Sequence, residues 1–145
     1  FSDSLITVCQ VKSWLLQMKK MLLLFLMCFS CIVSAQDFRC HKESLPDMAW
    51  KETCIFTGQS ILSSYKFVRK QFQETEAQYT KPRIPKKAIT YATGADNDLV
   101  KVSYLWKSKT YLLVKFDYEA SSAMVQWAFK QRKHSTIFIK TVFPP

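Results

Sequence analysis

The sequence predicts a small α+β domain held by one disulfide, and three observations carry that prediction. Apolar and polar residues alternate over 99–118, apolar residues recur at helical spacing within 61–79, and Cys40 and Cys54 form a close pair. Hydrophobic residues make up 48% of the chain and aromatic residues 14%, which is typical of a folded protein and not of a disordered one. We expect a single domain over residues 36–145.

Residues 18–35 have the three parts of a secretory signal peptide. Two lysines follow Met18, an apolar run covers residues 21–33, and Val33-Ser34-Ala35 supplies a cleavage motif before Gln36. A transmembrane helix needs about 20 apolar residues, and this run is shorter. We therefore expect a cleaved signal peptide and a secreted, extracellular protein.

Two further interpretations concern the ends of the chain. If residues 21–35 are not cleaved, they would anchor a single-pass membrane protein. Met18 is the first methionine, so residues 1–17 are interpreted as an upstream or non-native extension, with a long signal n-region as the alternative. The Pro144-Pro145 ending leaves open that the chain is a fragment.

The predicted secreted domain is strongly basic. The whole chain has 21 Lys and Arg against 11 Asp and Glu. Removing Lys12, Lys19, Lys20 and Asp3 with the leader leaves 18 against 10, so residues 36–145 carry a net charge of +8. Such an excess attracts acidic partners over long range.

The two cysteines left after cleavage, Cys40 and Cys54, are expected to form one structural disulfide in an oxidising compartment. Closing so short a loop is worth about 3 kcal/mol in the chain-entropy model. His41 is next to Cys40, but two cysteines and one histidine lack the spacing of a tetrahedral metal site. No metal is predicted, and residues 55–58 are expected to be a short extended segment that ends in a turn.

One or two amphipathic helices are predicted. Ile61, Tyr65 and Val68 fall at helical spacing after Ser60, a candidate N-cap, which favours a helix within 61–79. A second helix is expected over 123–133, where the basic end of the segment suits a helix C-terminus.

The segment 81–87 is predicted to be a linker, because its two prolines disfavour both helix interiors and central strands. It carries four positive charges and no acid, at Lys81, Arg83, Lys86 and Lys87. Three interpretations stay open: an exposed arm that binds an anionic partner, a solvated connector, and a processing site at Lys86-Lys87.

Residues 99–118 predict an antiparallel hairpin with a polar loop at 107–110. The alternating residues place one apolar set on one face of each strand, and β-branched and aromatic side chains suit a pleated surface. A final strand is predicted over 137–143.

The side chains offer no catalytic constellation. His41 and His134 are the two imidazoles, and the two glycines, Gly58 and Gly94, are too few for a phosphate-binding glycine motif. Asn97 is the one asparagine, and the residues after it do not form an N-glycosylation motif. We predict that the protein is not an enzyme and that it takes no cofactor.

Residues 40–56 and 99–108 resemble the N-terminal cap of secreted insect leucine-rich-repeat proteins, including those of the immune type. The shared features are a signal peptide, two cysteines about a dozen residues apart with a strand after the second, and a later strand followed by Lys107-Ser108. The resemblance implies a truncated cap, because no leucine-rich repeat follows in this chain, and stacked repeats bury the core of that fold.

The sequence therefore predicts a small secreted binding protein whose basic surface takes an acidic partner. The candidate partners are an anionic glycan, an anionic lipid surface or an acidic protein. Nucleic acid is not expected for a secreted protein, and the sequence makes no prediction of oligomeric state. The alternatives are the leucine-rich-repeat cap and the membrane-anchored protein.

Overall fold

The computed structural model describes residues 13–21, 38–71, 75–95 and 97–145. The chain divides into two compact units, Phe1–Ala35 and Gln36–Pro145. In the first unit, residues 13–21 form a helix whose side chains are all exposed. Most of the predicted signal peptide, residues 22–35, lies outside the described residues. Within the described part of the chain, no helix has the length and apolarity that crossing a membrane requires.

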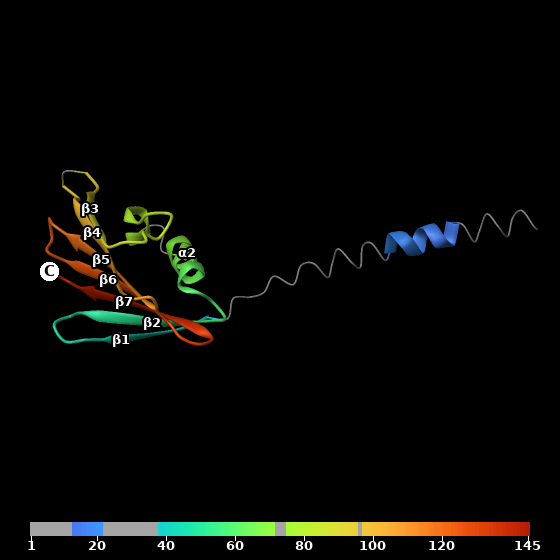
Figure 1. Cartoon of the computed structure of the whole chain (residues 1–145), viewed down its shortest axis with the longest axis horizontal. Helices are drawn as coiled ribbons and strands as arrows, with labels where there is room; N and C mark the ends of the chain where they lie inside the picture. The colour runs from blue at the N-terminus through green and yellow to red at the C-terminus, as the bar shows by residue number, and fades with distance from the viewer. Residues whose placement is uncertain (1–12, 22–37, 72–74, 96) are drawn as a thin grey trace, which may run out of the picture. The chain divides into compact units, whose positions relative to one another are not determined.

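The second unit is built on one antiparallel sheet of seven strands in the order β1-β2-β7-β6-β5-β4-β3. Helix α2 (Ile61–Gln71) and the 3-10 helix η1 (Glu76–Tyr79) follow β2 in the chain and cover one face of the sheet (Figure 1). The strands are β1 Phe38–Ser44, β2 Trp50–Thr57, β3 Ile89–Thr93, β4 Val100–Ser108, β5 Tyr111–Tyr118, β6 Met124–Gln131 and β7 Ser135–Phe143.

The α+β prediction holds at this coarse level, but the sheet is far larger than the predicted hairpin. The hairpin over 99–118 is present as β4 and β5, which pair with Val102 opposite Phe116. The strand predicted over 137–143 is present as β7, and the extended segment over 55–58 overlaps the end of β2. The helix predicted within 61–79 is present as α2, residues 72–74 lie outside the described residues, and η1 covers Glu76–Tyr79.

The helix predicted over 123–133 is wrong, because this segment is strand β6. Its apolar residues Met124, Trp127 and Phe129 and its basic end are compatible with a helix. The burial pattern instead has period two, with Val125, Trp127 and Phe129 all facing the core. Pairing with strands on both sides therefore decided the conformation of a segment whose apolar pattern fits either element.

The core lies between the covered face of the sheet and α2. Leu112, Phe129 and Phe138 are side-by-side partners on β5, β6 and β7, and all three are fully buried. Tyr65 of α2 packs over them, with its ring centroid 5.8 Å from that of Phe129. This aromatic layer fixes the helix on the sheet.

The opposite face carries a short apolar row. Leu105, Leu113, Ala128 and Ile139 are successive partners across β4, β5, β6 and β7. Leu113 and Ala128 are buried by their neighbours, and Leu105 and Ile139 are half-buried. Most strands therefore have apolar residues on both faces, which blurs the simple alternation that identifies a half-buried strand.

The segment 81–87 contains neither helix nor strand, and hydrogen bonds attach its beginning to the core. The Lys81 N–H donates to the Tyr104 hydroxyl oxygen at 2.9 Å, and the Tyr65 hydroxyl donates to the Lys81 carbonyl oxygen at 2.6 Å. The two hydroxyl oxygens are 2.7 Å apart in a buried contact. The segment is thus a connector whose first residue has a fixed position.

The disulfide prediction is confirmed. Cys40 on β1 and Cys54 on β2 are directly opposite in the ladder, and their sulfurs are 2.01 Å apart. The bond fastens β1, an edge strand whose residues are all exposed, to the sheet.

Candidate functional site

The connections of an antiparallel sheet place basic residues from distant parts of the sequence at one end. Each strand reverses the direction of the previous one, so the β4–β5 and β6–β7 turns lie at the same end, and β3 begins there too. We call this the basic end. Its three loops carry six exposed basic residues: Lys86 and Lys87 before β3, Lys107 and Lys109 at the β4–β5 turn, and Arg132 and Lys133 at the β6–β7 turn. The exposed Arg39 lies at the same end, near the start of β1.

Backbone hydrogen bonds join these loops. The Gln131 N–H donates to the Thr110 carbonyl oxygen at 2.8 Å, which links the two turns. The Gly58 N–H donates to the His134 carbonyl oxygen at 2.7 Å, so the end of β2 lies there too.

The connector reaches the same end through one side-chain bond. The indole N–H of Trp106, near the end of β4, donates to the Pro85 carbonyl oxygen at 2.9 Å. Lys86 and Lys87, the next residues in the chain, therefore lie beside the end of β4.

The described segments that form the basic end contain no Asp or Glu. These segments are residues 38–39, 55–60, 84–89, 105–113 and 128–137. Asp37, which precedes β1, lies outside the described residues. Like charges that are not neutralised by neighbours sum to a positive potential that extends about one Debye length into solution.

The opposite end of the sheet has both signs of charge. Figure 1 shows the β1–β2 turn and the C-terminus there, away from the β6–β7 turn. Glu43, Asp98 and Glu119 lie in or near its turns. Lys51 and Glu43 form an ion pair at 3.1 Å, which offsets part of the positive charge at this end. The two ends of one sheet therefore differ in electrostatic character.

The start of α2 is also fixed at the basic end. The Ile61 N–H donates to Gln131 Oε1 at 2.9 Å, and Gln131 Nε2 donates to the Gln59 carbonyl oxygen at 3.2 Å. The first turn of α2 has no acidic residue. The positive end of the helix dipole therefore lies at the basic end and adds to the positive potential of the lysines there.

The structure divides the four residues predicted as an anion-binding arm. Lys86 and Lys87 belong to the basic end. Lys81 does not, because its ammonium lies over the Tyr91 ring, 4.8 Å from the centroid, and its backbone is held by Tyr104. Arg83 is exposed between these two positions.

Sequence reasoning missed the other members of the basic end, Lys107, Lys109, Arg132 and Lys133. Each pair is an ordinary short basic turn when it is considered alone. In a run of consecutive antiparallel strands, every second turn lies at the same end of the sheet, and this rule places the two turns together. Applying the rule to the sequence requires that 124–131 be identified as a strand.

A surface cavity of about 600 Å³ lies along α2 and is lined by Ser63, Lys66, Phe67, Lys70 and Gln71. It is a shallow, open hollow on the exposed side of the helix, and it adds nothing to the basic end.

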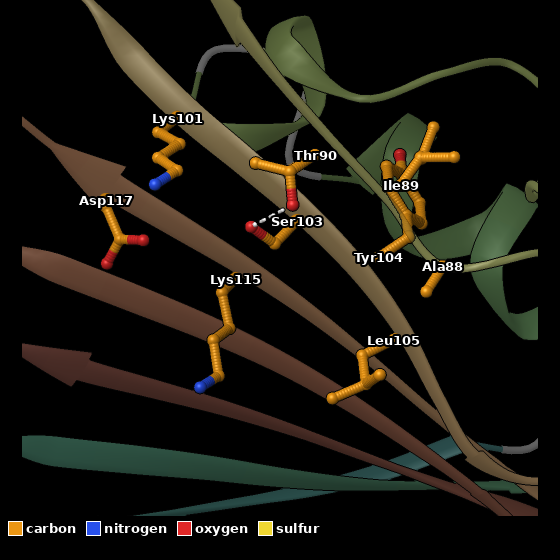
Figure 2. Close-up of a pocket in the computed structure, with 9 residues that line it drawn as sticks. All are labelled: Ala88, Ile89, Thr90, Lys101, Ser103, Tyr104, Leu105, Lys115 and Asp117. Atoms are coloured by element: carbon orange, nitrogen blue, oxygen red, sulfur yellow. Dashed lines mark hydrogen bonds between the residues drawn. The ribbon is translucent and has the colours of Figure 1, made fainter.

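A second open cavity of about 590 Å³ lies on the far side of the sheet, between β3, β4 and β5. Figure 2 shows Lys101, Lys115 and Asp117 on neighbouring strands, beside the hydrogen bond of 3.1 Å from the Thr90 hydroxyl to the Ser103 hydroxyl oxygen. This bond among the lining side chains joins the two hydroxyls to each other and involves neither lysine nor Asp117.

The buried tyrosines are structural groups. Burial is the main cause that raises the pKa of the Tyr65, Tyr91 and Tyr104 phenols above their ordinary value. They stay protonated near neutral pH and hold neighbouring backbone. The Tyr65 hydroxyl donates to the Lys81 carbonyl oxygen, and the Tyr104 hydroxyl oxygen accepts from the Lys81 N–H. The Tyr91 hydroxyl donates to the Tyr79 carbonyl oxygen of η1.

The described His, Cys, Asp and Glu residues include one close group, Cys40, Glu52 and Cys54, whose ligand atoms lie within 4.8 Å of one another. The two sulfurs are bonded to each other and are not available as thiolate ligands. The group is accounted for by the disulfide.

Comparison with known proteins does not assign the chain to a family. No protein-family model matches the chain, and neither a curated protein nor a solved structure gives a significant match.

Proposed function

We propose that this chain is a small secreted binding protein that attaches to an acidic partner through the basic end, without catalysing a reaction. One observation carries the proposal: three loops that are far apart in sequence present six exposed basic residues together, and the described segments around them have no carboxylate. The candidate partners are an anionic glycan, an anionic lipid surface or an acidic protein. Nucleic acid is not an expected partner of a secreted protein.

The proposed binding is driven by long-range attraction followed by multiple charge contacts. A concentrated positive field raises the rate of encounter with a polyanion. Each contact is weak alone, because an exposed ammonium stays hydrated, so affinity depends on several contacts that form together. The sheet holds the three loops at a fixed spacing, which lowers the entropic cost of forming several charge contacts together.

Salt dependence tests the electrostatic part of the proposal. Binding to heparin and to anionic vesicles would be measured at about 0.01 M and about 0.15 M ionic strength, between which the Debye length falls from about 30 Å to about 8 Å. We expect strong weakening at the higher ionic strength. Absence of binding, or binding that salt leaves unchanged, would end the proposal.

A matched pair of variants on one strand tests the location. Lys101 and Lys107 are both exposed on β4, one near each end of the strand. Lys107→Gln is expected to weaken binding by about 1 kcal/mol, near fivefold, because it removes a charge from the basic end. Lys101→Gln makes the same change in net charge at the opposite end and is expected to have little effect. Equal effects would show that total charge, and not this end, governs binding.

The two alternatives stay predictions. The leucine-rich-repeat cap would be supported by repeats encoded downstream of residue 145 in the genome. The membrane anchor over residues 21–35 would be supported by resistance of the expressed chain to carbonate extraction.

A further inference from the structure

Exposed apolar side chains gather at the basic end. Phe38, Ile55 and Leu62 are 42%, 45% and 49% exposed. They are three of the four exposed large hydrophobic residues in the described part of the second unit. The fourth, Met48, is 83% exposed and lies in the β1–β2 turn at the opposite end.

The register and the hydrogen bonds place the three residues beside the basic loops. Phe38 begins β1 and is opposite Phe56, and Ile55 is opposite Ile137 near the start of β7. Leu62 is the second residue of α2, next to Ile61, whose N–H is bound by Gln131. The three side chains are therefore spread over both layers of the fold at this end.

The two kinds of side chain together fit one class of acidic partner best. A sulfated glycan is hydrophilic, so contact with Ile55 or Leu62 would add little to its binding. A bilayer offers anionic headgroups to ammonium groups and, a few ångströms deeper, acyl chains to apolar side chains. Exposed apolar groups among basic residues are typical of proteins that lie on such a surface.

We infer that the basic end docks on an anionic lipid bilayer, with Phe38, Ile55 and Leu62 entering the interface and Lys107, Lys109 and Lys133 contacting lipid headgroups. This inference rests on the proposed function and specifies its partner. In this orientation, the strands run towards the bilayer, and the end with mixed charge points into solution.

The test separates the apolar contribution from the charges. Protein produced from the full chain would be sedimented with vesicles of phosphatidylcholine and phosphatidylserine, with vesicles of phosphatidylcholine alone, and assayed in parallel on heparin. The variant Ile55→Thr with Leu62→Gln keeps a β-branched residue in the strand and a good helix former in the helix. We expect it to bind mixed vesicles about 30-fold more weakly, because about half of each side chain is available for burial.

The matched control is Met48→Asn, which removes a more exposed apolar side chain at the opposite end. Asn suits the positive φ of 59° at this position. We expect it to bind mixed vesicles as the unchanged protein does. We also expect the double variant to keep its heparin binding, which shows that it is folded and that its charges are intact.

Three results would overturn the inference. Unchanged vesicle binding by the double variant would show that the apolar side chains do not enter the bilayer. Binding to phosphatidylcholine alone as strong as to mixed vesicles would remove the role of anionic lipid. Salt-sensitive heparin binding without vesicle binding would reject the bilayer while leaving the proposed function in place, with a glycan or an acidic protein as the partner.

Discussion

Lys140 and Glu76 form a buried ion pair that joins β7 to η1, and its loss should be among the most damaging single changes. The Lys140 ammonium donates to Glu76 Oε2 at 2.8 Å, and the two side chains are 8% and 7% exposed. The pair fixes the segment after α2 on the sheet. Glu76→Gln keeps the shape of the side chain but removes the negative charge.

The expected cost follows from desolvation. Removing one partner of a buried pair leaves a charge in a poorly solvated place and costs about 3–5 kcal/mol. Glu52 is directly opposite Lys140 in the ladder, and the Trp50 ring centroid is 5.7 Å from the ammonium. Both offset part of the loss, so we expect about 3 kcal/mol, a large share of the 5–15 kcal/mol typical of a domain.

Urea unfolding provides the assay, and a second ion pair provides the control. Lys51 and Glu43 are 3.1 Å apart, but their side chains are 35% and 44% exposed. Glu43→Gln should therefore cost less than about 1 kcal/mol. The double change Glu76→Leu with Lys140→Met should cost less than Glu76→Gln alone, because it removes both charges. If Glu76→Gln and Glu43→Gln lowered the free energy of unfolding equally, the argument that burial makes the Lys140–Glu76 pair more important would be refuted.

Three further predictions concern stability. Replacing Cys40 and Cys54 by alanine should lower the free energy of unfolding by about 3 kcal/mol in urea titrations; no loss would mean that the sheet alone holds β1. Burial raises the pKa of the Tyr104 phenol, so stability should be complete below about pH 10 and fall as pH rises towards the folded-state value. Tyr104→Phe should reduce that slope, and a flat profile for the unchanged protein would contradict the assignment. Gly94→Ala should destabilise the protein more than Gly58→Ala. An added Cβ on Gly94, at φ 106°, would meet a backbone carbonyl, whereas the space beside Gly58, at φ 70°, is open. Thermal unfolding that shows the reverse order would refute this.

The sequence predicted the hairpin of β4 and β5 well because polar and apolar residues alternate over much of both strands, despite Leu105 and Leu113 on the second face, and the loop between them is polar. It failed at 123–133, where Ala128 on the second face gives an apolar run in the middle of β6. Such a run has no single period, so local pattern does not separate helix from strand. The first strand was missed for the opposite reason, because every residue of β1 is exposed and the segment has no apolar face.

The candidate site was predicted in part. Lys86 and Lys87 were selected because they stand in a visible run of positive charge. Lys109 and Lys133 are far from that run in sequence. The order of the strands in the sheet places them at the same end, and composition does not reveal that order. Lys81 was selected by the same run, but a tyrosine ring and a backbone hydrogen bond hold it elsewhere.

Mapping the binding surface by amide chemical shifts, during titration with a short heparin oligosaccharide and then with anionic lipid discs, tests the central claim most directly. The account predicts that the largest changes fall on residues 86–87, 107–110 and 131–134, with few changes at 45–49, 97–99 and 119–122. Changes that concentrate in the second set, or that spread evenly over both ends of the sheet, would contradict it.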